Sequence, residues 1–353
     1  MAFQRIVTNK IHTTVVMEEV NWGIIGCGNV TEKKSGPAFS KASGSNLLAV
    51  MRRTEAKARD YAVRHGVPAF YTDVDLLLSH PNLNALYIAT PPDTHAEYAI
   101  KAMQAGKVAY VEKPMALTPA ECEQMIRVSS ETGQPLFVAY YRRLLPEYLK
   151  IKELIESGEI GQVKLVKICL HHPLKAEETN QNQSLGWRVN PAISGGGHFH
   201  DLAAHQLDYL EYLFGEAIDV KGIALNQAGC YPADDMVAAA FRFQSGVAVS
   251  GSWCFTVPEA LRDDTTEIIG SEGRIVFSFF AHTDILVEKS AGSAYTLSVP
   301  PPEHIQQPLI QSIVDELRGK GKCPSTGQTG IRATILMDQI TNGSHTSPQV
   351  LKF

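Results

Sequence analysis

The alternation of strand-like and helix-like segments between Trp22 and Val138 restricts the fold of this 353-residue chain more than any other feature. Short apolar runs at 22–25, 47–51, 85–89, 108–111 and 136–139 are separated by segments with helical periodicity, such as 54–65 and 96–105. This alternation is typical of a parallel sheet with covering helices. Residues 20–142 are therefore predicted to form a doubly wound α/β domain.

The pattern changes after Arg143. Helices are predicted at 146–156 and 199–214, and strands at 163–170, 218–225, 236–243, 247–255, 265–269 and 274–279. Turn signals at 244–246 and 270–273 separate neighbouring strands, which indicates antiparallel hairpins. Residues 143–353 are predicted to form an α+β domain with an open, mainly antiparallel sheet and helices on one face. Since the bare face would need cover, we expect association through it.

The composition excludes several classes of partner. The formal net charge of −5 gives no reason to expect nucleic acid or an anionic membrane surface. No apolar run reaches the roughly 18 residues that a membrane span needs, and the first residues lack the apolar region of a secretory signal. The six cysteines show no Cys-x-x-Cys spacing, so we expect reduced thiols in a cytoplasmic protein.

A glycine turn follows the first predicted strand. Glycines there allow a tight turn and close approach of the backbone to a pyrophosphate at a helix N-terminus. Thr31 replaces the third small residue of the usual pattern and is expected to loosen helix packing, and Ser35-Gly36-Pro37 is expected to restart the helix. An isolated turn of this kind is equally well an ordinary glycine turn, but its position predicts a dinucleotide site. The predicted cofactor-binding residues of the turn are Gly26, Gly28, Asn29 and Val30.

Two further loops belong to the predicted cofactor site. Arg52 and Arg53 end the second strand, where an acid would select NAD and an arginine accepts the 2′-phosphate of NADP. We therefore predict NADP over NAD, although these arginines could simply solvate the strand end. Thr90, Pro91 and Pro92 are predicted to form a wall against the nicotinamide. His95 either joins that wall or caps the next helix.

The candidate catalytic residues lie in two distant segments. Lys113 follows a strand and precedes Pro114, which favours an extended backbone with the side chain in the crevice, where a lysine can polarise a substrate oxygen. Asp201 and His205 share one helical face after three glycines, and a neutral imidazole can accept a hydroxyl proton. A surface lysine and a simply capped helix N-terminus are the alternatives. His198 and His200 complete a group of metal-ligand types, but no second ligand group is evident and no metal is predicted.

These motifs resemble one family when they are taken in order. They are Gly26-Cys27-Gly28, Thr90-Pro91-Pro92 with His95, Glu112-Lys113-Pro114, Trp187-Arg188, and the triple glycine with Asp201 and His205. Over about residues 21–340 the chain resembles the glucose-fructose oxidoreductase/inositol dehydrogenase/MocA family. The resemblance implies a Rossmann domain, an open-sheet substrate domain, a tightly held nicotinamide cofactor, sugar or cyclitol substrates, and dimers or tetramers built through the open sheet.

The resemblance also implies site residues. It implies Lys113, Asp201 and His205 as the catalytic set, with Glu112 and Lys113 beside the cofactor. Family members that act on dihydrodiols carry tyrosine at the position of His205, which favours the sugar and polyol branch. The predicted substrate-binding residues are Arg142, Arg188, His200 and Asp201, whereas Arg143 and His172 are interpreted as structural.

Three functions fit these residues. The first is reversible oxidation of a secondary hydroxyl of a sugar, polyol or cyclitol by a nicotinamide cofactor. A glycosidase that oxidises its substrate transiently and then eliminates would use the same residues without net reduction of the cofactor. A non-catalytic redox or sugar sensor would not need Lys113 and His205 together.

Overall fold

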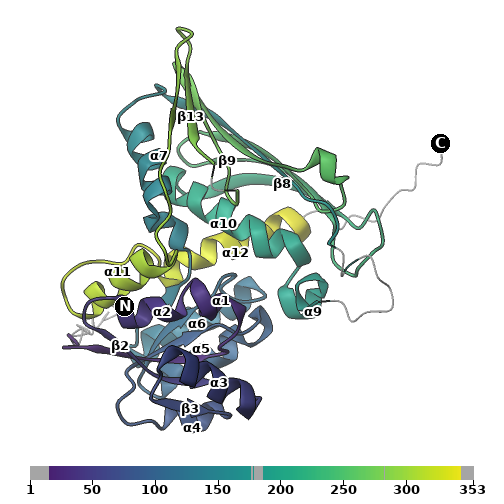
Figure 1. Cartoon of the computed structure of the whole chain (residues 1–353). Coiled ribbons are helices and arrows are strands. Elements are labelled where there is room, and N and C mark those ends of the chain that lie inside the picture. Colours follow the sequence, from purple (N-terminus) through teal and green to yellow (C-terminus); the bar gives the residue numbers. More distant parts are fainter. Residues whose placement is uncertain (1–15, 176–177, 179–185, 282, 343–353) are drawn as a thin grey trace, which may run out of the picture.

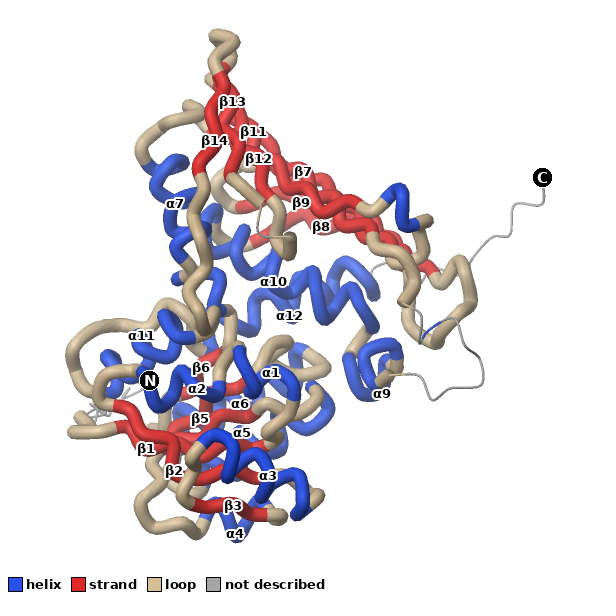
Figure 2. Tube along the Cα trace, viewed as in Figure 1, coloured by secondary structure: helices blue, strands red, loops and turns tan. Residues whose placement is uncertain are grey.

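The computed structural model describes residues 16–175, 178, 186–281 and 283–342. Two sheets dominate it, a parallel one surrounded by helices and a broad one beside it (Figures 1 and 2). No helix among these described residues is long and apolar enough to cross a membrane.

The first sheet has six parallel strands in the order β3-β2-β1-β4-β5-β6. Its order reverses between β1 and β4, and ligands of such sheets bind outside the carboxyl ends of the strands at this point. The doubly wound prediction is confirmed, although β3 was not predicted. The strands are β1 (Val20–Ile25), β2 (Ser45–Met51), β3 (Ala69–Tyr71), β4 (Ala85–Ile88), β5 (Val108–Val111) and β6 (Leu136–Val138).

Helices connect these strands. The helix predicted at 54–65 is observed as α3, and the one predicted at 96–105 is observed one residue earlier as α5. Thr118 and Glu121 form a capping box at the start of α6, which fixes where the chain turns after Lys113. The helices are α1 (Asn29–Lys33), α2 (Gly36–Lys41), α3 (Glu55–His65), α4 (Val74–Leu78), α5 (His95–Gln104) and α6 (Pro119–Thr132).

The break between α1 and α2 lies where the sequence predicts a restart. Thr31 is fully buried, and its hydroxyl donates to the Gly28 carbonyl at 2.8 Å, so the expected loosening is not seen at this residue. A Cβ on Gly36 would lie 2.1 Å from the Thr31 carbonyl oxygen and 2.2 Å from the Tyr61 hydroxyl. Only glycine allows this close approach, which ties the turn to α3.

The second sheet has eight strands in the order β14-β13-β12-β11-β7-β10-β9-β8. All neighbours are antiparallel except β7 and β10. Both predicted hairpins, β9–β10 and β11–β12, are confirmed, whereas β13 and β14 were not predicted. The strands are β7 (Val163–His171), β8 (Ala217–Leu225), β9 (Met236–Phe243), β10 (Ala248–Cys254), β11 (Asp263–Gly270), β12 (Gly273–Phe277), β13 (Ile285–Lys289) and β14 (Ala294–Leu297).

The helices of this half lie on one face of the sheet, as predicted (Figure 2). They are α7 (Pro146–Glu156), α10 (Gly197–Phe214) and α12 (Gly327–Asn342), and the short helices η2 (Tyr141–Leu144), η3 (Trp187–Val189) and α9 (Pro191–Ser194) connect to them. The helix predicted at 199–214 is confirmed as α10, which begins two residues earlier.

The carboxyl-terminal segment crosses between the two halves. Helix α11 (Gln307–Leu317) packs on α2, and α12 contacts α6 and β6 on one side and α10 and β8 on the other. Neither helix was predicted. The boundary proposed at residues 142 and 143 stays a prediction, but the chain beyond residue 300 contacts both halves.

Candidate active site

A cavity of about 480 Å³ lies where the two halves meet. Residues from the loops after β1, β4 and β5 line one side, and residues of η2, η3 and α10 line the other. Its lining includes Asn29, Val30, Lys34, Thr90, Pro92, Glu112, Lys113, Tyr141, Arg142, Trp187, Arg188, Asp201, His205, Phe280 and Gln306. The cavity therefore sits at the carboxyl ends of the parallel strands, where this kind of sheet binds ligands.

Lys113 and Asp201 form an ion pair in this cavity. The Nζ atom of Lys113 lies 2.5 Å from Oδ1 of Asp201 and 2.7 Å from its main-chain oxygen. Arg188 donates from Nε to the other carboxylate oxygen at 2.9 Å. Burial opposes ionisation of Asp201, but the charges of Lys113 and Arg188 outweigh it and hold the pKa of this carboxyl well below its usual range. Asp201 is therefore a fixed anion that orients both cations.

His205 lies one turn further along α10, with its ring centroid 5.0 Å from that of Tyr141. Its side chain is buried, and Nδ1 has no hydrogen-bond partner among the described residues. Burial, together with the charges of Arg142, Lys113 and Lys34, lowers the pKa of His205 well below its usual value. The imidazole is therefore neutral at physiological pH, which is the form that can accept a proton.

Glu112 lines the cavity and also belongs to a buried hydrogen-bond network. Its carboxylate accepts hydrogen bonds from the hydroxyl of Tyr87, from Nε2 of Gln306 at 2.6 Å, and from the main-chain N–H of Lys113 at 3.1 Å. Tyr110 donates to the amide oxygen of Gln306 at 2.9 Å. The network fixes the backbone beside Lys113. Sequence reasoning missed Gln306, because it comes almost 200 residues later and no local motif marks it.

The end of β2 carries two arginines with different environments. Arg52 donates from Nη1 to the carbonyl of Cys27 at 2.9 Å and so supports the glycine turn. Arg53 is exposed, and its side chain forms no ion pair or hydrogen bond with the part of the chain that the structure describes. Glu55, the nearby acid, is paired with Arg59 at 2.6 Å. At the end of β2, where doubly wound sheets select the dinucleotide, Arg53 is therefore unpaired among the described residues and Glu55 is paired with Arg59.

His95 lies between the predicted cofactor loop after β4 and the loop that carries Lys113. One ring nitrogen lies 2.8 Å from the Thr90 carbonyl and the other 2.9 Å from the Pro114 carbonyl. Burial lowers the pKa of His95. The residue is outside the cavity lining, as is Pro91, and Thr94 rather than His95 precedes α5 as its N-cap. His95 thus links the loop after β4 to the loop that carries Lys113.

Other predicted residues lie away from the cavity. His200 is not in its lining; it packs beside Gly196, and burial lowers its pKa to about 4. His198 pairs with Glu178 at 2.6 Å, next to Tyr231. Arg143 pairs with Asp208, as expected of a structural arginine. Within the described ranges no group of three or more His, Cys, Asp or Glu residues could hold a metal ion.

Two segments of the chain match models of known protein families. Residues 20–140 match the model of the oxidoreductase family with an NAD-binding Rossmann fold, and residues 148–276 match the GFO/IDH/MocA C-terminal domain. An oxidoreductase of Formosa agariphila is 41% identical over 322 residues, which cover 90% of this chain and 97% of that protein.

The chain belongs to the GFO/IDH/MocA family of oxidoreductases.

Two more distant GFO/IDH/MocA relatives are similar over nearly the whole chain. The scyllo-inositol 2-dehydrogenase (NAD(+)) of Bacillus subtilis is 26% identical and covers 90% of each chain. A levoglucosan dehydrogenase solved with NADH and levoglucosan has a TM-score of 0.80 at 23% identity, and the match covers 91% of this chain and 96% of that one. In this GFO/IDH/MocA chain the first matched segment supplies Lys113 and the second supplies Asp201 and His205.

Proposed function

We propose that this oxidoreductase transfers a hydride between a nicotinamide cofactor and a secondary hydroxyl or keto group of a sugar, polyol or cyclitol. The convergence of Lys113, Asp201 and His205 in one cavity carries the proposal, because it unites a cation and a neutral base beside the dinucleotide turn. The names of the inositol and levoglucosan dehydrogenases support the substrate class.

The glycine turn fits a dinucleotide. Gly26 has a φ of 89°, and a Cβ on Gly28 would meet no atom closer than 3.8 Å, so the backbone leaves room for a ligand. Helix α1 has no side-chain cap, which leaves the N–H groups of Asn29 and Val30 available to a pyrophosphate, while that of Thr31 donates to the Gly28 carbonyl at 3.0 Å. When bound, the nicotinamide ring supplies the hydride acceptor or donor.

The protein side chains would then divide the work. Lys113 donates a hydrogen bond to the reacting oxygen and stabilises negative charge on it. Asp201 keeps the ammonium group in place through the 2.5 Å ion pair. His205 accepts the hydroxyl proton during oxidation and returns it during reduction. Arg188, whose guanidinium lies 4.4 Å from the Trp187 ring centroid, lines the cavity and would orient the substrate.

Exchange of Lys113 tests the proposal. Lys113→Met should lower kcat by about 100-fold or more in a spectrophotometric assay of cofactor reduction, while cofactor affinity changes little. Lys101→Met is the matched control, since Lys101 pairs with Glu97 on the exposed face of α5. Equal activity of both variants would remove the lysine from the mechanism. Cleavage of a glycoside without net cofactor reduction would instead favour the elimination reaction.

The proposed cofactor is NADP. The free guanidinium of Arg53 suits a 2′-phosphate, and the pairing of Glu55 with Arg59 leaves no acid in place to hold a 2′-hydroxyl. Nucleotide released from denatured native protein should therefore be NADP, which mass spectrometry can identify. NAD(H) as the released species would overturn this choice.

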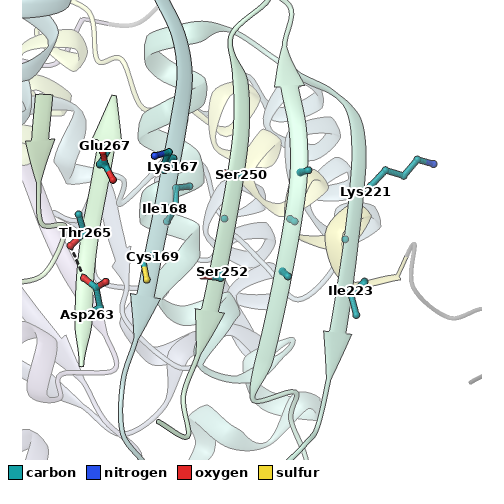
Figure 3. A pocket seen from close by; sticks show the side chains of 15 residues that line it. Lys167, Ile168, Cys169, Lys221, Ile223, Ser250, Ser252, Asp263, Thr265 and Glu267 are labelled. Carbon is teal, nitrogen blue, oxygen red and sulfur yellow. Dashed lines mark hydrogen bonds between the residues drawn. The ribbon is translucent and has the colours of Figure 1, made fainter. Parts of the chain in front are cut away.

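The proposed assembly is a homodimer or homotetramer in the cytoplasm, built through the bare face of the second sheet. Small side chains leave a shallow depression of about 680 Å³ across this face (Figure 3). Lys167 and Lys221 point from the same face as Asp263 and Glu267, so a second copy could pair with them (Figure 3). Ala240→Arg should produce monomers in analytical ultracentrifugation, whereas an unchanged mass would exclude this face.

A further inference from the structure

Arg142 is a buried cation whose observed hydrogen bonds all go to neutral oxygens. Only 5% of its surface is exposed. Its guanidinium donates to three neutral oxygens: the hydroxyl of Tyr148 at 3.0 Å, the hydroxyl of Tyr141 at 3.2 Å and the carbonyl of Phe279 at 2.8 Å. Arginine has five N–H donors, so two remain after these bonds. Among the described carboxylates, Glu147 interacts with the charge of Arg142, but Glu147 is itself buried, and burial raises its pKa to about 7.

The neighbouring Arg143 is a buried arginine with a carboxylate partner. Arg143 is equally buried, but it donates from Nε to Asp208 at 2.9 Å and from Nη2 to the other carboxylate oxygen. Burying an uncompensated charge is costly, and native proteins normally pair it in this way. Arg142 differs from Arg143 in a second respect, because it lines the cavity.

The surroundings of Arg142 hold it in one orientation. Its guanidinium carbon lies 4.8 Å from the ring centroid of Phe280 and 5.2 Å from that of Tyr141. Both aromatic residues also line the cavity. The ring of His205 packs against the same two aromatic residues, with its centroid 5.0 Å from that of Tyr141 and 6.3 Å from that of Phe280. The arginine is therefore fixed beside the proposed base.

The charges of the cavity are not balanced. The cationic residues in its lining are Lys34, Lys113, Arg142 and Arg188, and the anionic ones are Glu112 and Asp201. Asp201 is shared between Lys113 and Arg188, and Glu112 accepts hydrogen bonds from the neutral donors described above. Lys34 follows the glycine turn, on the side of the cavity where the proposed dinucleotide would bind. Arg142 lies on the opposite side, in η2, and is left for the substrate.

We infer that the substrate is a sugar acid whose carboxylate binds Arg142 while a ring hydroxyl faces His205 and Lys113. The inference rests on the proposed function and narrows its substrate class. A carboxylate matches the planar donors of a guanidinium and would compensate the buried charge. Sulfate esters and phosphate esters share the oxyanion chemistry and are distinguished by the test below.

Matched pairs of sugars test the inference on the cofactor-loaded enzyme. D-glucuronate is compared with D-glucose, and D-galacturonate with D-galactose, by the rate of cofactor reduction. The acids should show a kcat/KM about 100-fold higher than the neutral sugars, since the couplings measured between close charge pairs include this factor. Glucose 6-sulfate and glucose 6-phosphate form the third arm. A preference for either ester would overturn the carboxylate, and a preference for neutral sugars would overturn the whole inference.

The Arg142→Met variant shows whether the preference comes from this residue. The ratio of kcat/KM for acid over neutral sugar should fall to about one, and Arg142→Lys should restore part of it because the charge returns without the planar fork. Arg127→Met, on the exposed face of α6, is the matched control and should keep the wild-type ratio. A parallel loss on both sugars, with the ratio unchanged, would make Arg142 structural and contradict the inference.

A binding measurement separates this inference from the proposed function. If no sugar is oxidised, or if Arg142→Met does not fold, calorimetry of D-glucuronate and D-glucose with the cofactor-loaded wild-type protein still decides. Binding of the acid at least about 100-fold tighter, and weakening with added salt, supports the anion site. Equal or absent binding of both sugars contradicts it, whatever reaction the enzyme performs.

Discussion

The ammonium group of Lys113 and the carboxylate of Asp201 are 2.5 Å apart, although 88 positions separate the two residues in the chain. Lys113 follows β5 of the parallel sheet, whereas Asp201 lies in α10, which packs under the second sheet. The contact joins the two halves at the point where substrate and cofactor must meet. Four predictions follow from this contact and its surroundings.

Asp201→Asn should lower kcat by about 100-fold, because Lys113 loses the anion that positions it. It should also change the stability of the protein in a pH-dependent way. The pKa of Asp201 is lowered in the folded state, so its contribution is fully present above the unfolded pKa of about 3.9 and is lost as the pH falls through the lower folded value. Urea unfolding of both proteins should show a difference at pH 7 that shrinks below about pH 4. A difference that grows on acidification would contradict this assignment.

His205→Asn should lower kcat by about 100-fold to 1,000-fold in the oxidative direction. The pKa of His205 lies well below its ordinary value, so the imidazole stays neutral as the pH falls through 6.5. The acid limb of the wild-type kcat/KM profile should therefore lie below pH 6.5. A limb at or above the ordinary value would show that another group, or a charged imidazole, controls the reaction.

Gln306→Leu should destabilise the protein by about 1–3 kcal/mol, because it removes a donor from the buried carboxylate of Glu112. It should also lower kcat, since Glu112 holds the backbone N–H of Lys113. Gln311→Leu is the matched control from the same segment, where the side chain is partly exposed and bonds Asp315. Thermal unfolding and steady-state kinetics check both variants, and identical behaviour would remove Gln306 from the site.

Arg53→Asp should raise the KM for NADP by at least about tenfold while the KM for NAD changes less, because the free cation is replaced by an acid that can hold a 2′-hydroxyl. Arg127→Met again serves as the control. Initial rates with both cofactors give the ratio of kcat/KM directly. If that ratio stays constant, the strand end does not select the cofactor.

The parallel sheet could be predicted because its strands are short apolar runs with clear breaks. The strand Ala69–Tyr71 was missed, since it has only three residues and all are half-buried. In the second half, the apolar run of β13 is only three residues long (Ile285–Val287), and β14 (Ala294–Leu297) is largely exposed.

Helical periodicity accounts for both the success and the failure in the site. Asp201 and His205 are four residues apart and therefore share the face that lines the cavity. His200 is one residue from Asp201, about 100° around the helix, and lies outside that lining. Gln306 and Phe280 carry no local motif, since their places are set by how distant segments pack.

Through the contact of Gln306 with Glu112, the carboxyl-terminal segment supports the backbone beside Lys113. No local sequence motif predicts this role. The chain leaves the nucleotide-binding half after β6 and forms the second sheet. It then returns to the first half, where Gln306 bonds Glu112 beside Lys113. A chimera of two relatives that are joined only after β6 would thus lose the matched contact between Gln306 and Glu112. Chimeras should keep their activity only when the segment that contains Gln306 and α11 comes from the same relative as the nucleotide-binding half.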